Sequence, residues 1–217
     1  MSENDLQFLL ENNRAWASQM AARNPDFFAN LSQQQSPTYL WIGCSDSRIP
    51  ATQVVGLDPG EIFVHRNVGN VVVHTDLNCL SVIQYAVEVL RVRTIIVCGH
   101  FGCGGVHAAL RDAYHGLIDN WLRHIQDVAE KYEERLAALD DEKKRWDRLC
   151  ELNVIEQVAN VCHTTVVQQA WRSGQQLHVH GCIYGVHNGL MHDLGVSISA
   201  TAEIIPVCRQ AVARLGA

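Results

Sequence analysis

The stretch YLWIGCSDSR (residues 39–48) joins a short apolar run to a polar segment in which cysteine, aspartate and arginine alternate with serine. A second stretch, TIIVCGHFGCGG (residues 94–105), follows the same plan. Each apolar run is short and reaches a glycine, so each predicts a buried strand with a loop at its carboxyl end. Ligands of open α/β sheets bind at such loops. We therefore expect an α/β fold with its functional site where these two strands end.

Three side chains in these loops form a candidate metal site. His100 and Cys103 are three residues apart, which lets one turn of chain aim both at a single point, and Cys44 supplies a third ligand from the other loop. Two thiolates and one imidazole are a ligand set of catalytic zinc, and three ligands leave one position open. Asp46 is the only carboxylate near enough in sequence to compete for that position. Arg48 can hold it ionised through a bidentate contact.

Composition limits the class of protein. The chain has 217 residues, enough for one domain with a sizeable core, and a formal net charge of −6 that argues against a nucleic-acid surface. No apolar run is long enough to cross a bilayer, and the polar, acidic start lacks the pattern of a signal peptide. Eight cysteines without an export signal predict reduced thiols or metal ligands. We expect a cytoplasmic protein with no nucleic-acid or membrane partner.

The rest of the chain predicts a mostly parallel sheet covered by helices on both faces, in one domain over residues 1–217. Residues 1–35 are helical and precede the first strand, so they have no place in a minimal α/β unit. Residues 116–150 form a charged helical insertion on the surface, with Asp140 and Asp141 as a break or cap. We expect further strands at 61–66 and 177–184, and helices at 5–20, 25–31, 76–90, 104–113, 152–172 and 202–214.

Most other reactive side chains have a structural interpretation. A cysteine near a strand end is usually a small buried hydrophobe. The ten histidines other than His100, including His178 and His180, are expected to have no part in metal binding or catalysis. The glycines of residues 99–105 form neither the dinucleotide fingerprint nor a P-loop. Amides at Gly104 and Gly105 are nevertheless placed to meet an anion at a helix start. The cysteines interpreted as structural are Cys79, Cys98, Cys150, Cys162, Cys182 and Cys208.

Three motifs together resemble a known family. CSDSRIPA (residues 44–51), QYA (84–86) and GHFGCGG (99–105) resemble the signatures of the β-class carbonic anhydrases, and the likeness extends over nearly the whole chain. The resemblance implies a zinc enzyme that interconverts carbon dioxide and bicarbonate through zinc-bound hydroxide. It also implies a parallel-centred α/β fold that forms homodimers and often dimers of dimers, with residues 1–35 as the arm that embraces the partner subunit.

The resemblance also assigns roles to residues. It makes Cys44, His100 and Cys103 the zinc ligands, and Asp46 with Arg48 the paired dyad beside the metal. The carbon dioxide pocket falls on Phe63, Val68 and Tyr85, while Gln35 reaches the substrate across the dimer interface and an amide near Gly104 steadies bicarbonate. Because two thiolates donate more negative charge than neutral imidazoles, hydroxide should form less readily here. An ionised Asp46 would orient the water and select hydroxide.

A further set resembles a regulated subgroup of the family, termed type II. Trp41, Arg66 and Tyr184 match a noncatalytic bicarbonate pocket. In such members the counterpart of Asp46 leaves its arginine and closes on zinc. The resemblance therefore implies inactivity at lower pH and inhibition by bicarbonate. The alternative is that Trp41 is a core residue and Arg66 a structural ion-pair partner.

Two other functions stay open. Similar zinc sites hydrolyse carbon disulfide or carbonyl sulfide, and the pattern alone does not separate that activity from hydration. A noncatalytic zinc or redox-sensing module, permanently closed by Asp46, is the alternative from another class. It leaves Arg48 and the apolar pocket without a task.

Overall fold

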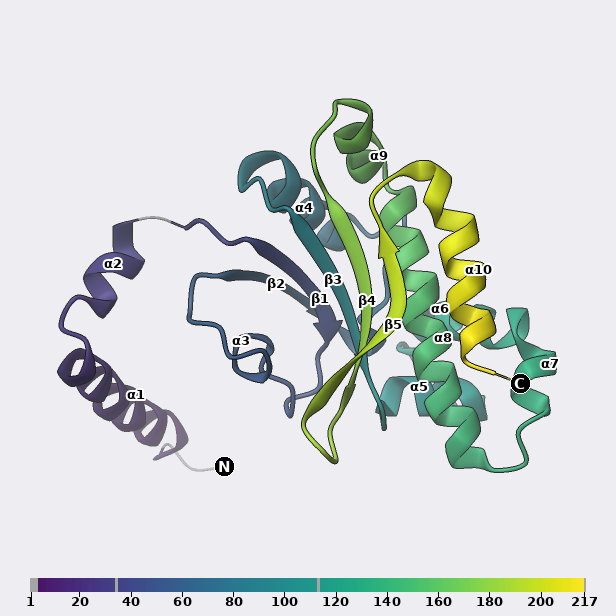
Figure 1. Cartoon of the computed structure of the whole chain (residues 1–217). Helices are drawn as coiled ribbons and strands as arrows, with labels where there is room; N and C mark the ends of the chain where they lie inside the picture. Colours follow the sequence, from purple (N-terminus) through teal and green to yellow (C-terminus); the bar gives the residue numbers. More distant parts are fainter. Residues whose placement is uncertain (1–3, 34, 113, 217) are drawn as a thin grey trace. The chain divides into compact units, whose positions relative to one another are not determined.

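The computed structural model describes residues 4–33, 35–112 and 114–216 (Figure 1). The chain divides into two compact units, Met1–Ser36 and Pro37–Ala217. The first unit contains α1 (Asn4–Arg23) and α2 (Phe27–Gln33), so both expected helices are present. The rings of Trp16 and Phe28 meet edge to face with centroids 5.8 Å apart. Several large apolar side chains of this unit are exposed, among them Leu6, Phe8, Leu9 and Leu10.

The second unit is built on a five-stranded sheet of order β2-β1-β3-β4-β5. The first four strands pair in parallel and β5 is antiparallel to β4, which confirms the mostly parallel sheet. The parallel order places the carboxyl ends of β1 and β3 side by side. The strands are β1 (Tyr39–Cys44), β2 (Ile62–Asn67), β3 (Thr94–His100), β4 (His178–Gly185) and β5 (Leu190–Ile198).

Strand β5 was not expected from the sequence. Its first four residues are exposed, and buried positions begin only at Leu194. An edge strand that buries only its second half shows too short an alternation of apolar and polar residues to predict a strand. Its buried residues Leu194, Val196 and Ile198 nevertheless join the main core.

The main core lies between one face of the sheet and several helices (Figure 1). Helix α8 contacts β3 and β4 closely. A Cβ atom at Gly99 would lie 2.5 Å from Val154 Cγ2, and one at Gly181 would lie 3.0 Å from Val158 Cγ2, so these glycines permit the approach. The remaining elements of this side are α4 (Leu77–Gln84), α5 (Gly104–Arg111), α6 (Asp119–Lys131), α7 (Glu133–Ala137), α8 (Glu142–His163), α9 (Thr165–Arg172) and α10 (Ile204–Arg214), with the short turns η1 (Val68–Asn70), η2 (Tyr85–Val89) and η3 (Thr201–Glu203).

Helices cover the two faces of the sheet unequally. On the opposite face a smaller cluster contains Trp41, Ile62, Cys98 and Cys182, and α3 (Ala51–Val54) contributes Ala51 to it. The side chains of β1 alternate between the two clusters, with Leu40 and Ile42 in the main core and Trp41 in the smaller one. Strand β1 is therefore packed on both faces, and the loop that follows Cys44 begins at a firmly positioned strand end.

The helix boundaries correct two expectations. The helix expected at 152–172 is two helices, because Thr164 caps α9 by accepting from the Val167 amide. The helix expected at 76–90 starts at the predicted cap Asp76 but ends in the π-helical turn η2. In residues 116–150, expected as a surface insertion, most positions are exposed or partly exposed. The segment is helical, and Asp141 caps α8, but Leu122 and Ile125 are buried in the main core.

Candidate metal centre

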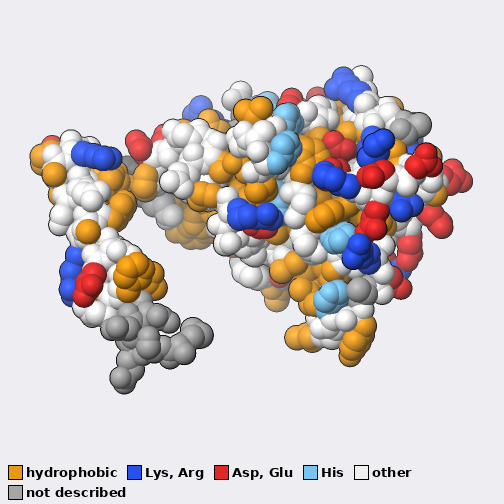
Figure 2. Space-filling view, turned by 90° about the horizontal axis from the view of Figure 1, so that it is seen from below, with side chains coloured by type: hydrophobic (Ala, Val, Ile, Leu, Met, Phe, Trp, Pro, Cys, Tyr) orange, Lys and Arg blue, Asp and Glu red, His pale blue; other side chains and the backbone are white. Residues whose placement is uncertain are grey.

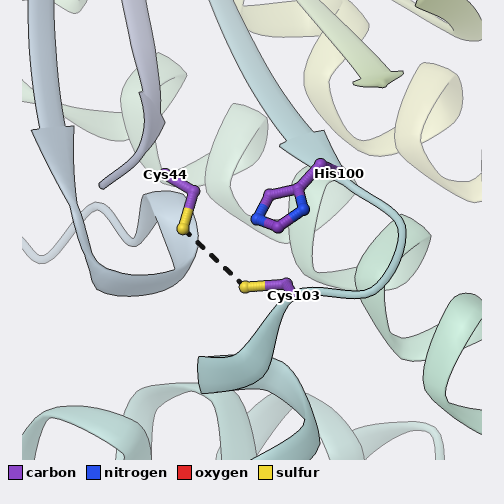
Figure 3. Close-up of side chains that lie close together, drawn as sticks. All are labelled: Cys44, His100 and Cys103. Atoms are coloured by element: carbon purple, nitrogen blue, oxygen red, sulfur yellow. Dashed lines mark hydrogen bonds between the residues drawn. The ribbon is translucent and has the colours of Figure 1, made fainter. Parts of the chain in front are cut away.

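Three buried side chains converge where β1 and β3 end. Cys44 is the last residue of β1, His100 the last of β3, and Cys103 directly precedes α5. Their ligand atoms all lie within 4.8 Å of one another, and the two sulfurs are 3.8 Å apart. Figure 3 shows both sulfurs and the imidazole ring turned toward a common point. The structure thus brings together the three residues that the sequence predicted as ligands.

The imidazole of His100 is oriented for ligation. Its Nδ1 lies 3.0 Å from the carbonyl oxygen of Phe101, which fixes Nδ1 as the protonated nitrogen. Its Nε2 is buried and has no hydrogen-bond partner. A buried lone pair without a donor is costly in a folded protein. A cation between Nε2 and the two sulfurs would satisfy it, and a carbonyl on the other ring nitrogen is the usual support for a metal-binding histidine.

The two thiols are electrostatically coupled. The hydrogen bond between the side chains of Cys103 and Cys44 lowers the pKa of Cys44 to about 4. The amide of Gly69 also lies 3.5 Å from Cys44 Sγ. The same hydrogen bond between the two cysteines raises the pKa of Cys103, with burial and the charge of Cys44 as further causes. One proton is therefore shared between two sulfurs that both bind metals as thiolates. A divalent cation would replace this proton and neutralise both sulfurs, so the donor set fits zinc.

Asp46 lies beside this group and is held by Arg48. Arg48 Nε donates to Oδ1 at 2.9 Å and Nη2 to Oδ2 at 2.6 Å, while the Arg48 amide donates to Oδ1 at 3.0 Å. These bonds hold the pKa of Asp46 well below its usual range. Asp46 Oδ2 is 3.7 Å from His100 Nε2, but Asp46 is not among the ligand atoms that lie within 4.8 Å of one another. The carboxylate is thus paired with arginine.

Arg66 fixes the backbone of the same loop. Its Nε donates to the carbonyl oxygen of Cys44 at 2.7 Å, and its Nη2 donates to that of Asp46. Arg66 is paired in register with Gly43 across β2 and β1. Its observed partners are therefore backbone carbonyls, whereas the structural alternative expected an ion pair.

The other two residues of the expected bicarbonate pocket share the face of the smaller cluster. Trp41 is buried and Tyr184 packs against that cluster from β4. The indole lies over Gly43, where a Cβ atom would be 2.3 Å from Trp41 Nε1. Alternation along β2 places Arg66 on the face of Ile62, which is also in this cluster. Trp41, Arg66 and Tyr184 thus lie on one face, with β3 between the tyrosine and the other two.

Two of the expected substrate residues pack against each other, and a third lies beside the start of α5. The rings of Phe63 and Tyr85 have centroids 5.8 Å apart. Val68 packs over the start of α5, because a Cβ atom at Gly105 would lie 2.7 Å from Val68 Cγ1. Gly104 is the exposed first residue of α5. Gln35 belongs to the first unit, so its contact with substrate stays a prediction.

The sequence-based prediction missed the polar side chains that hold the segment after β2, whose Gly69 amide lies beside Cys44. Asn153 Nδ2 donates to the carbonyl oxygen of Gly69 at 2.8 Å, and Gln157 accepts from the amide of Val72 at 2.8 Å. Asn153 and Gln157 are both buried and bond to each other at 2.9 Å. Two buried amide side chains four residues apart on an otherwise apolar helix face were the available signal.

Comparison with known proteins identifies the family. Residues 39–191 match the family model described as carbonic anhydrase. A carbonic anhydrase of Emericella nidulans is 48% identical over 188 residues, which cover 87% of this chain and 82% of that protein. A tetrameric β-carbonic anhydrase structure from Sordaria macrospora is 40% identical with a TM-score of 0.87, and the match covers 91% of this chain and 100% of that one.

A second solved structure extends the match to both units. The β-carbonic anhydrase of Coccomyxa, solved with acetazolamide, is 40% identical with a TM-score of 0.89 and covers 97% of this chain and 96% of that one. The resemblance in the three sequence motifs is thus confirmed by both sequence and structure. With its buried cysteine, histidine and cysteine at the strand ends, the chain belongs to the β-class carbonic anhydrase family of enzymes.

Proposed function

We propose that this chain catalyses the reversible hydration of carbon dioxide to bicarbonate and a proton, with zinc held by Cys44, His100 and Cys103. The observation that carries the proposal is the buried Nε2 of His100, which lacks a partner and shares its site with two thiols. Zinc bound there would lower the pKa of a water molecule and so provide a nucleophile near neutral pH. Three protein ligands leave the position that this chemistry requires.

Asp46 and Arg48 position the reacting water. An ionised carboxylate can only accept hydrogen bonds, so Asp46 favours an oxygen that still carries a proton and disfavours one that does not. Arg48 supports this role because its hydrogen bonds keep the carboxylate ionised and orient it so that Oδ2 lies closest to His100. Phe63, Val68 and Tyr85 would supply the apolar surface for carbon dioxide. Gln35 and the Gly104 amide would hold the oxygens of bicarbonate.

We further propose that Asp46 is a switch linked to pH and bicarbonate. In the closed state its carboxylate would leave Arg48 and occupy the open position on the metal. Arg66 connects the bicarbonate pocket to this movement, because the same guanidinium that would pair with the anion now binds the carbonyls of Cys44 and Asp46. An anion held by Arg66, Trp41 and Tyr184 would compete for these bonds and loosen the loop. The pairing with Arg48 argues against a permanently closed site.

Assembly is a second part of the proposal. The exposed apolar side chains of α1 suit the arm of a homodimer, and the Sordaria macrospora relative is described as tetrameric. We expect a dimer, with two dimers pairing, and we expect the chain in the cytoplasm. Among the described residues no helix is long and apolar enough to cross a membrane. On the face in Figure 2, Lys and Arg side chains are interspersed with Asp and Glu, with no continuous basic patch.

Sedimentation of the chain beside a Leu9→Glu variant tests the arm, since a charge on α1 should shift the assembly toward monomers.

Stopped-flow hydration of carbon dioxide on protein of measured zinc content tests the proposed reaction. Activity that rises from mildly acidic to alkaline pH in zinc-loaded protein supports both hydration and the switch. Full zinc loading without hydration at any pH in this range would contradict the proposal. Turnover of carbonyl sulfide and carbon disulfide in the same preparation distinguishes a sulfur-substrate hydrolase from a noncatalytic module.

A further inference from the structure

A second group of potential metal ligands lies between β2 and α4. His65, Asp76 and Cys79 each offer one ligand atom, and the three atoms lie within 4.8 Å of one another. They form a group separate from that of Cys44. His65 comes from the middle of β2, Asp76 caps α4, and Cys79 lies in the first turn of that helix. The sequence pattern predicts no chemistry at His65 or Cys79, and the proposed reaction uses none of the three.

Burial distinguishes this group from an ordinary surface cluster. Cys79 is 0% exposed and His65 is 5% exposed, whereas Asp76 is partly exposed. Burial lowers the pKa of His65, which keeps the imidazole neutral and its lone pair available. Burial also raises the pKa of Cys79 to about 12, with the charge of Asp76 as a further cause. A fully buried thiol of this kind cannot serve as a nucleophile toward an external substrate.

The hydrogen bonds of the group leave ligand atoms free. Asp76 Oδ1 accepts from the Asn78 amide at 3.0 Å, and the other carboxylate oxygen is not used by this cap. His65 Nε2 lies 3.2 Å from Asn67 Nδ2, which also donates to the carbonyl oxygen of Val71 at 2.7 Å. Asn67 can therefore release the imidazole and keep its bonds to Val71. A metal bound at Nε2 would replace one long hydrogen bond with a coordinate bond, and a metal bound at Nδ1 would leave the contact with Asn67 in place.

We propose that His65, Asp76 and Cys79 form a second cation site, which takes a thiophilic divalent ion such as zinc or cobalt. One imidazole, one carboxylate and one thiol are donors that zinc accepts in proteins, whereas calcium and magnesium prefer oxygen alone. The partly exposed Asp76 is the entry point for the ion. The cation would neutralise the carboxylate and stabilise the thiolate that forms when Cys79 loses its proton. Water does not reach this depth to stabilise that charge.

Cobalt titration of the zinc-loaded protein tests this site. We expect a second metal per chain after gel filtration, measured by mass spectrometry of the elements, and a thiolate-to-cobalt absorption band in the near ultraviolet. Zinc release is measured in the same samples, because cobalt that exchanges into the Cys44 site would also give such a band. Binding without zinc release supports a second site, whereas a band that only accompanies zinc release overturns it.

Two variants assign the bound ion to these residues. Cys79→Ala should abolish the second equivalent and its absorption band, while Cys162→Ala removes another fully buried cysteine and should retain both. Asp76→Asn is the variant for which folding is least at risk, since an amide oxygen can still cap α4. It should weaken cobalt binding by at least about tenfold. A second equivalent that binds equally well in Asp76→Asn would overturn the assignment, as would its absence from the unmodified protein.

Discussion

Arg66 donates through Nε to the carbonyl oxygen of Cys44 at 2.7 Å, so a side chain of β2 holds the residue that ends β1 and is a candidate metal ligand. The same guanidinium donates to the carbonyl of Asp46. One arginine therefore fixes the backbone of a candidate ligand and of the carboxylate beside it.

Replacing Arg66→Ala should destabilise the protein and reduce hydration. Two carbonyl acceptors lose a charged donor, and hydrogen bonds to charged groups contribute about 1.5–3 kcal/mol each. Urea unfolding measures the free energy of unfolding, and stopped-flow assays measure the rate. Arg172→Ala is the control, because Arg172 is exposed and far along the chain on α9. Equal stability of the two variants would contradict the role given to Arg66.

Replacing Asp46→Asn should lower the hydration rate on the order of 100-fold while zinc stays bound. The amide can donate as well as accept, so it no longer selects an oxygen that carries a proton. Rate and zinc content are measured on one preparation, with the exposed Asp140→Asn as control. If zinc is lost along with activity, Asp46 is a permanent ligand and the division of roles is wrong.

Replacing Arg48→Gln should raise the pKa of Asp46, because hydrogen bonds from Arg48 are the main cause of its depression. Carbon-13 NMR of the labelled aspartates follows this carboxyl directly. A depressed folded-state pKa stabilises the protein above the unfolded value of about 3.9, and this contribution is lost as pH falls through the folded-state pKa. The unmodified protein should therefore lose more stability than the variant on acidification. An unchanged Asp46 titration in the variant would refute the stated cause.

Replacing Tyr184→Phe should weaken inhibition by bicarbonate if the pocket with Trp41 and Arg66 is regulatory. The hydroxyl is the only donor that this residue offers to an anion. Hydration rates at several bicarbonate concentrations measure the effect, and Tyr114→Phe is the control because Tyr114 is 92% exposed. Identical inhibition of the two variants, or none in the unmodified protein, would leave Trp41 and Tyr184 as core residues.

The three candidate metal ligands were predictable because short-range signals converge on them. Cys44, His100 and Cys103 follow two apolar runs directly, and parallel strands bring such ends together whatever the rest of the chain does. Strand β5 was not predictable in the same way, because Leu194 follows four exposed residues and only tertiary packing shows that it is buried. The buried face of α6 is different, because Leu122, Ile125 and Val128 recur at helical spacing and mark one apolar face that the expectation of a surface insertion overlooked.

The cluster of His65, Asp76 and Cys79 shows another limit of sequence reasoning. Asp76 and Cys79 share the start of α4, but His65 joins them only through the packing of β2 against that helix. A single buried cysteine has a structural interpretation on its own. Proximity to a histidine eleven residues before the helix cap cannot be inferred from helical or strand periodicity.

Replacing Asn153→Leu should weaken zinc binding from a distance. Asn153 holds the carbonyl of Gly69, whose amide lies 3.5 Å from Cys44 Sγ, and its own oxygen accepts from Gln157. Leucine is of similar size but leaves a buried carbonyl and a buried amide unpaired, at a cost of about 1–3 kcal/mol.

The η1 turn should then relax away from Cys44 and reduce zinc affinity on the order of tenfold, as loss of a supporting contact does at other metal sites. Competition with a chelator measures the affinity, and urea unfolding of the zinc-loaded protein measures the stability. Asn120→Ala removes an asparagine that bonds only an exposed carbonyl, that of Leu117, and should change neither quantity. If Asn153→Leu lowers stability but not zinc affinity, the buried amides support the core alone, and the position of Cys44 depends on Arg66.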